Sequence, residues 1–204
     1  MGLYADYIFP LCCDTLMSAP DLQRIRKQAL ENVSGEILEI GFGTGLNLPH
    51  YPAEVGKITT VEVSKGMNRK ALKRIEDSGI EVDSKILDGK SLPMVDESFD
   101  CIVVTWTLCS IREIDSAMIE MHRVLRPGGR LVFVEHGLSN EARIQRWQNF
   151  FTPFQKIFAV GCHLNRDMKA IIEKPGFSFE NLQEFYLDNA PKPLGYTYQG
   201  VAVK

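Results

Sequence analysis

Short apolar runs alternate with helical patterns through the middle of the chain. Apolar side chains dominate residues 37–40, 58–63, 82–87, 99–105 and 130–135, and this pattern predicts five strands. Residues 99–105 form the most apolar run and are expected to be central, whereas 82–87 is more polar and is expected nearer an edge. Strands that alternate with helices predict a parallel sheet with helices on both faces.

Helical periodicity fills the intervals between these runs. Apolar residues recur at helical spacing over 67–75 and over 114–125, and the second of these helices is expected to stop at the Arg-Pro-Gly-Gly cluster of 126–129. An aromatic-rich helix is expected over 141–161, bent by Pro153.

The last forty residues follow a different pattern. A short helix is expected over 166–174, and two strands are expected over 177–186 and 195–203. A brief Pro-rich turn joins these two strands, so they must be antiparallel. The sequence therefore predicts a Rossmann-like, doubly wound α/β fold: a seven-stranded, mostly parallel sheet with an antiparallel last strand.

Length, charge and cysteine content narrow the class of protein. A chain of 204 residues suits a single domain, and 23 basic against 26 acidic residues give no basic excess for binding nucleic acid. The five cysteines are odd in number and form no Cys-x-x-Cys pair, which favours reduced thiols in the cytoplasm. No apolar run approaches the roughly 18 residues of a membrane-spanning helix.

A glycine-rich segment, Glu39-Ile-Gly41-Phe-Gly43-Thr-Gly45, stands where the first strand ends and a helix is expected to begin. Such glycines let the backbone turn tightly and approach a ligand closely. A dinucleotide-binding loop requires its third glycine at position 46, which is Leu46 here. The carboxylate of Glu39 would also repel a pyrophosphate, whereas it suits a cationic amino group.

Two further carboxylates follow the next two strands. Glu62 ends the second strand, where a carboxylate is suited to hydrogen-bond both hydroxyls of a ribose. Asp88, followed by Gly89, comes after the third strand and could accept from an adenine amine. Together with Glu39 these groups meet at one edge of the sheet, where a nucleoside with a cationic amino-acid tail would fit. S-adenosylmethionine is such a molecule.

In these stretches the sequence resembles the class I S-adenosylmethionine-dependent methyltransferases of the type 11 superfamily. The matching segments are 38–45, 88–93 with 98–100, and 125–129. Within that superfamily, residues 107–110, 135–136, 161–166 and 200–204 are most similar to the methyltransferase-like seven group, small membrane-associated enzymes known for methylating thiols. The chain departs from this group in carrying Glu62 where Asp is usual and in lacking the hydrophobic leader of the animal proteins.

The resemblance implies one methyltransferase domain over 1–204. Its parts are an N-terminal helical lid (1–35), a cofactor-binding core (36–135), a helical cap over the active site (137–176) and terminal antiparallel strands (177–204). The resemblance also implies a set of residues that bind the cofactor: Glu39, Gly41, Phe42, Gly43, Thr44, Gly45, Asn47, Glu62, Val63, Ser64, Met67, Asp88, Gly89, Thr105, Trp106, Thr107 and Cys109.

Catalytic and acceptor-binding residues have weaker signals, since methyl transfer requires mainly proximity and alignment. His136 follows the fifth strand and could accept a proton from a thiol, hydroxyl or ammonium group, although a structural histidine is an equal alternative. Cys109 is expected to pack in a cofactor wall. No metal is expected, because Cys162 and His163 are sequence neighbours with no further ligand in range. The residues expected to bind substrate are Trp106, His163, Arg166 and Tyr196.

The sequence is thus interpreted as a methyltransferase that uses S-adenosyl-L-methionine and acts on a small, fairly apolar acceptor, with a thiol as first choice. Alternatives are a phospholipid amine, a quinone-ring carbon or a catalytically silent cofactor-binding protein; a nicotinamide oxidoreductase is disfavoured. We expect a cytoplasmic monomer or homodimer with no nucleic-acid partner. Flanked by basic residues, the aromatic helix suggests a peripheral contact with an anionic membrane.

Overall fold

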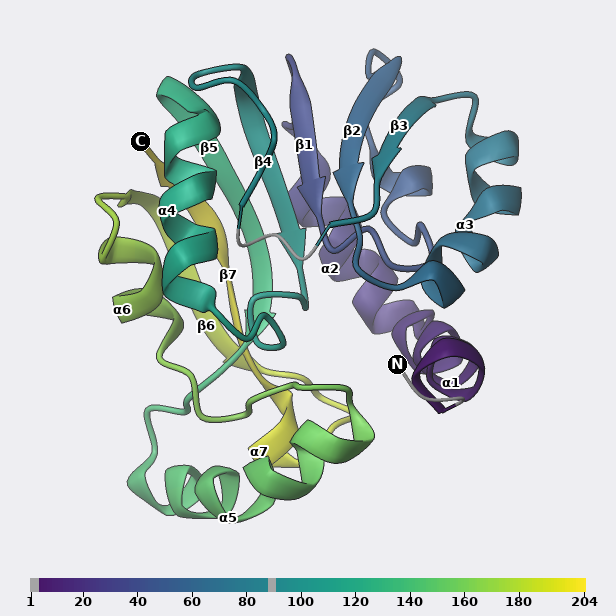
Figure 1. The fold of residues 1–204 in the computed structure, drawn as a ribbon. Coiled ribbons are helices and arrows are strands. Elements are labelled where there is room, and N and C mark those ends of the chain that lie inside the picture. Colours follow the sequence, from purple (N-terminus) through teal and green to yellow (C-terminus); the bar gives the residue numbers. More distant parts are fainter. Residues whose placement is uncertain (1–3, 88–90) are drawn as a thin grey trace.

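The computed structural model describes residues 4–87 and 91–204 and contains one seven-stranded sheet (Figure 1). The strands lie in the order β3-β2-β1-β4-β5-β7-β6. They are β1 (Ile37–Ile40), β2 (Lys57–Val61), β3 (Glu81–Lys85), β4 (Phe99–Thr105), β5 (Leu125–His136), β6 (Ser178–Tyr186) and β7 (Tyr196–Val203). The first five strands are mutually parallel and β7 is antiparallel to both of its neighbours, which confirms the predicted fold class.

Helices cover both faces of this sheet, as in a doubly wound fold (Figure 1). The longer ones are α1 (Phe9–Met17), α2 (Pro20–Leu30), α3 (Lys65–Ser78), α4 (Ile114–Val124) and α5 (Ala142–Phe158). The shorter ones are the π-helix η1 (Tyr4–Ile8), the 3-10 helix η2 (Leu48–His50), α6 (Met168–Glu173) and α7 (Lys192–Gly195).

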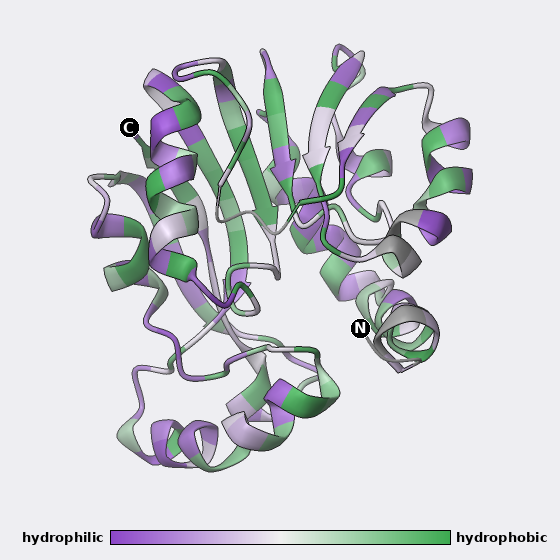
Figure 2. Cartoon of the chain, viewed as in Figure 1, coloured by the Kyte–Doolittle hydropathy of each residue, from purple (hydrophilic) through white to green (hydrophobic). Residues whose placement is uncertain are grey.

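Alternating side chains of the central strands build the two halves of the core. In β4, Ile102 and Val104 pack with the buried residues of α4 and α6, whereas Cys101 and Val103 pack with those near α2 and α3. Both sets are almost fully buried, and the central strands are accordingly green in Figure 2. The apolar run over 99–105 is therefore central because it supplies side chains to both layers.

Two local predictions need correction. A helix was expected to begin after the glycine segment, but the chain there forms only the three-residue η2, because Tyr51, directly before Pro52, is extended and ends the helix. The segment 126–129 was expected to be a turn, but it belongs to β5, with a register shift against β4 between Phe99 and Cys101. The other strands and helices for which bounds were predicted lie within a few residues of those bounds, and the Pro-rich turn before the last strand contains the short α7.

The carboxyl ends of β1 and β2 point toward the side of the molecule where α1 and α5 lie (Figure 1). Helix α5 contains Pro153 in its interior and packs against α7. The N-terminal segment meets the end of α5, since the Tyr4 hydroxyl donates to the Phe158 carbonyl at 2.7 Å. Within the part of the chain that the structure describes, no helix is both long and apolar enough to cross a membrane.

Candidate active site

The glycine segment forms a tight loop directly after β1. Gly41, Gly43 and Gly45 all have positive φ angles, of 77°, 59° and 78°. A Cβ on Gly41 would lie 2.0 Å from Thr107 Oγ1, so only glycine fits where this loop meets the segment after β4. Two segments predicted to share the cofactor are thus in direct contact.

The carboxylate of Glu39 lies fully buried at the end of β1. It accepts hydrogen bonds from Asn47 Nδ2 at 2.8 Å and from the Tyr51 hydroxyl at 2.7 Å. Asn47 also donates to Thr105 Oγ1 at 3.1 Å, which links β1 to the end of β4. Burial raises the pKa of Glu39 to about 7, although these hydrogen bonds and Arg26 oppose the rise. A cation bound beside Glu39 would lower this pKa and favour the ionised carboxylate.

Arg26 of α2 is a charged residue at this site that sequence patterns did not identify. It is only 4% exposed, and its guanidinium carbon lies 4.5 Å from the centre of the Trp106 ring. Its Nε and Nη1 groups have no hydrogen-bond partner among the described residues. Burial lowers the pKa of Arg26 to about 10, partly offset by the charge of Glu39. A buried cation with free donors is suited to bind an anionic ligand group.

Glu62 occupies the corresponding place after β2. Its carboxylate accepts from Gly43 N at 2.8 Å and from Ser64 N at 2.7 Å, and burial raises its pKa despite these bonds. Ser64 in turn caps α3 by accepting from Met67 N at 3.3 Å. Val63 between them is half exposed. Phe42 is buried in the core beside the loop.

The third predicted carboxylate, Asp88, and its neighbour Gly89 lie outside the described residues. The adenine contact expected there stays a prediction. Met67, the other residue expected beside the adenine, is 9% exposed in the first turn of α3.

Asp14 of α1 binds the glycine loop and α3. Asp14 accepts from Thr44 Oγ1 at 2.6 Å and from Arg74 Nη1 at 2.8 Å, and it pairs with Lys70 at 3.4 Å. Arg74 also donates to the Thr44 carbonyl at 2.9 Å. Although burial opposes it, these partners lower the pKa of Asp14, so it stays ionised and the N-terminal helix remains tied to the loop.

The segment after β4 is held in place by Glu135, a fully buried residue of β5. Its carboxylate accepts from the backbone N–H groups of Thr107, Leu108 and Cys109, at 2.5, 2.8 and 3.4 Å. Trp106, at the start of the segment, has a φ of 49°, which is unusual for a bulky residue. Several hydrogen bonds therefore fix a strained segment beside the glycine loop.

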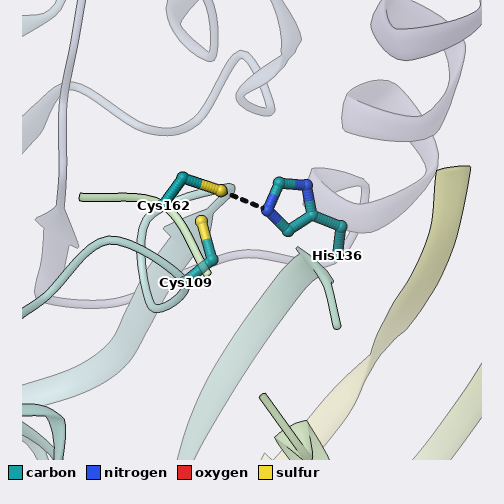
Figure 3. Close-up of side chains that lie close together, drawn as sticks. All are labelled: Cys109, His136 and Cys162. Atoms are coloured by element: carbon teal, nitrogen blue, oxygen red, sulfur yellow. Dashed lines mark hydrogen bonds between the residues drawn. The ribbon is translucent and has the colours of Figure 1, made fainter. Parts of the chain in front are cut away.

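Two cysteines and a histidine meet next to this segment (Figure 3). The sulfurs of Cys109 and Cys162 and one ring nitrogen of His136 all lie within 4.8 Å of one another. His136 Nε2 and Cys162 Sγ share a hydrogen bond of 2.7 Å. Together these residues are called the Cys–His–Cys cluster below.

The three residues of the Cys–His–Cys cluster shift one another's pKa values. A hydrogen bond from Cys162 and the charge of His136 lower the pKa of Cys109 against the effect of burial. The pKa of Cys162 is raised by that same hydrogen bond and by burial. Burial acts to lower the pKa of His136, but the charge of Cys109 outweighs it and the pKa is raised.

The residues predicted to bind substrate have structural partners. Arg166 donates to the carbonyls of Leu108 and Ile111, and His163 Nδ1 lies 3.1 Å from the carbonyl of Cys109. The Tyr196 hydroxyl donates to Glu184 at 2.7 Å. Arg166 and His163 thus touch the segment after β4, while Tyr196 lies in the core; acceptor contacts by these residues stay predictions.

Comparison with known proteins agrees with this arrangement. The family described as "Methyltransferase domain" matches residues 38–133. Thiol S-methyltransferase TMT1B of Rattus norvegicus is 33% identical over 86% of this chain and 74% of its own length. Phosphatidylethanolamine N-methyltransferase of Cereibacter sphaeroides is 36% identical over 69% of each chain. A solved S-adenosylmethionine-dependent methyltransferase of Thermotoga maritima has the same fold, with a TM-score of 0.67, 23% identity and coverage of 97% of this chain and 98% of its own.

The resemblance inferred from the sequence motifs is therefore confirmed, and so is the cofactor that it implies. The acidic strand ends, the glycine loop and the likeness to TMT1B lead to one conclusion. The chain belongs to the class I S-adenosylmethionine-dependent methyltransferases.

Proposed function

We propose that this methyltransferase transfers the methyl group of S-adenosylmethionine to the sulfur of a small, fairly apolar thiol. The observation that carries the proposal is the extent of the likeness to a thiol S-methyltransferase, which spans 86% of the chain. A match of that length includes much of the sequence outside the core of residues 36–135. Acceptor contacts are expected from those outer segments, so the likeness bears on the acceptor as well as on the cofactor.

The residues at the carboxyl edge suit S-adenosylmethionine, which supplies a methyl group on a positively charged sulfur when it is bound. In this proposal Glu39 faces the amino group and Arg26 takes the carboxylate, to which its free Nε and Nη1 groups can donate. Glu62, beside the glycine loop, takes the ribose hydroxyls. A buried acid and a buried base close together match the two charges of an amino acid.

The protein's own contribution to the reaction is alignment. Glu135 fixes the segment after β4 against the glycine loop, so the acceptor and the methyl group are held in one line. A thiol reacts as its thiolate. In this proposal the Cys–His–Cys cluster stabilises that thiolate, and His136, the predicted catalytic residue, is its member able to carry positive charge or bind a metal.

The outer segments supply an apolar surface for the acceptor. Helix α5 exposes Phe150, Phe154 and Ile157 by 53–71% of their areas, and η1 and α1 expose Tyr7, Ile8 and Leu11 to a similar degree. The hydrogen bond between Tyr4 and Phe158 brings these two apolar segments together. We assign them as the predicted lid (1–35) and cap (137–176), which would exclude water from the reacting thiolate.

A second acceptor class is favoured by the same surface. A phospholipid amine would reach the site from a membrane, and a phosphatidylethanolamine N-methyltransferase is 36% identical over 69% of the chain. Exposed aromatic residues of α5 are accompanied by Arg143, Arg146 and Lys156, a combination typical of helices that bind anionic membrane surfaces. In either case we propose that α5 contacts the membrane surface.

A radiolabelled methyl-donor screen tests the proposal. The purified protein would be incubated with alkyl and aryl thiols, phenols and quinols, and vesicles that contain phosphatidylethanolamine, each in a separate reaction. We expect label in the thioether fraction at rates that exceed the other classes at least tenfold. Label in lipid alone would support the second class instead.

A further inference from the structure

Three soft donor atoms, each from a different segment, converge at the Cys–His–Cys cluster. Cys109 lies in the segment after β4, His136 ends β5, and Cys162 lies in the loop after α5 (Figure 3). We propose that Cys109, His136 and Cys162 bind one Zn²⁺ ion, with a fourth position open to the thiolate of the acceptor. The inference rests on the proposed thiol function for its fourth ligand only.

The donor atoms are spaced for a small cation. Tetrahedral zinc with bonds of about 2.3 Å to sulfur and about 2.0 Å to nitrogen separates two sulfurs by about 3.8 Å and a sulfur and a nitrogen by about 3.5 Å. All three donors lie within 4.8 Å of one another. The 2.7 Å contact between His136 and Cys162 would have to open by less than about 1 Å, which a small side-chain rotation allows.

The backbone already holds the two cysteines in place. The Cys109 N–H donates to Glu135, and the Cys109 carbonyl accepts from the N–H of His163 at 2.9 Å. Since His163 follows Cys162 directly, this bond joins the two cysteine-bearing segments. Secondary contacts of this kind orient metal ligands and reduce the cost of assembling the site.

Charge balance also favours a dication. Both thiols are buried, and they lie near the buried carboxylate of Glu135 and the guanidinium of Arg166. One Zn²⁺ ion would neutralise two thiolates and leave Glu135 balanced by Arg166, so no net charge would be buried.

The donor set indicates the kind of metal site. Two thiolates and an imidazole suit zinc, and three protein ligands with an open position are typical of catalytic rather than structural zinc. An acceptor R–SH that bound there would exchange its S–H bond for a zinc–sulfur bond, and the proton would be released to solvent. In this state His136 would be a ligand rather than a base, and the charge of the metal would lower the pKa of the bound thiol.

Metal binding by the reduced, full-length protein tests the site directly. The probe is Zn²⁺ alone, titrated by calorimetry, with Co²⁺ as a coloured substitute. We expect one ion per chain, a sulfur-to-cobalt charge-transfer band, and the loss of both in C109A and C162A. C101A is the matched control, since Cys101 is an equally buried cysteine on the opposite face of β4, and it should bind normally.

Several results would overturn the inference. Failure of the reduced wild-type protein to bind Zn²⁺, or unchanged binding by C109A and C162A, would contradict the metal site. Circular dichroism identifies variants that fail to fold, and chelation of the wild-type protein tests the same point without any substitution.

A cobalt spectrum that a small thiol leaves unchanged would contradict the open position, whereas thiol turnover at the full rate in chelated protein would contradict the role of the metal. Metal binding without thiol turnover would contradict the proposed function, and the site for the ion would stand.

Discussion

The guanidinium of Arg26 lies 4.5 Å above the ring of Trp106, and two of its N–H groups have no partner among the described residues. The indole face partly compensates a buried positive charge. Glu39 lies close enough to influence the pKa of Arg26. The contact thus links α2, which precedes the cofactor-binding core of residues 36–135, to the end of β4, where the methyl acceptor is expected.

Replacing Arg26 by methionine is expected to act in opposite directions on cofactor binding and on stability. Loss of hydrogen bonds to a charged carboxylate should raise the Kd for S-adenosylmethionine about 10- to 100-fold, because such bonds are worth about 1.5–3 kcal/mol. The free energy of unfolding without cofactor should rise, since a buried, incompletely paired charge is removed. Calorimetry and denaturant unfolding measure the two effects.

The control for this substitution is R24M on the same helix. Arg24 is exposed and pairs with Asp21 at the surface, so both quantities should stay unchanged. Wild-type affinity in R26M would show that the carboxylate binds elsewhere.

Cofactor binding should strengthen as the pH rises through 7. The pKa of Glu39 is about 7 in the folded protein and 4.5 ordinarily, so between these values the folded chain retains a proton that the unfolded chain has lost. Below pH 4.5 this difference in proton affinity contributes roughly 3 kcal/mol to the free energy of unfolding. The contribution is lost as the pH rises through 7. The carboxylate that forms can then bind the amino group of the cofactor.

Calorimetric titrations with S-adenosylmethionine at pH 6 to 8 measure this dependence. Arg26, Glu62 and Tyr51 face Glu39 from the neighbouring elements, and of these only Glu62 is a further carboxylate. E39Q should bind weakly at every pH. E36Q, at an exposed position before β1, should behave like the wild type. An equally steep pH dependence in E39Q would assign the titration to another group.

Arg166 should act as a positioning residue rather than as a contact for one acceptor. Its guanidinium donates to the carbonyls of Leu108 and Ile111, which stabilises the segment that carries Cys109. We expect R166M to lower the free energy of unfolding by about 2–4 kcal/mol and kcat for all thiols alike. K169M, exposed on α6, is the control. A raised KM for a single acceptor at unchanged stability would instead support the original prediction of a substrate contact.

The exposed apolar side of α5 should determine membrane binding. Phe154 and Ile157 are 53% and 71% exposed, and each large apolar side chain that enters a membrane interface contributes about 1–2 kcal/mol. The double variant F154S/I157S should therefore sediment at least tenfold less with anionic vesicles. I119S removes an isoleucine of α4 that is 59% exposed, and this variant should sediment like the wild type. Absence of wild-type binding at low salt would refute the membrane contact.

Sequence patterns predicted the parts of the site that parallel strands place in register. Glu39 and Glu62 end adjacent parallel strands, so their meeting at one edge follows from the fold. Arg26 could not be predicted, because its helix carries two other basic residues, Arg24 and Lys27, and only burial distinguishes it. Cys162 was compared with its sequence neighbour His163, whereas the structure pairs it with His136, 26 residues away. Loop packing of this kind leaves no periodic signal.

We propose a thiol sulfur as the atom that accepts the methyl group. The most direct measurement is the initial rate of S-methyl thioether formation from a small aryl thiol, followed by mass spectrometry with deuterium-labelled S-adenosylmethionine. We expect a saturable rate that requires Arg26 and Glu62 and yields one labelled thioether for each donor consumed. Cofactor binding of normal strength without any labelled thioether, together with label in phosphatidylethanolamine, would contradict it.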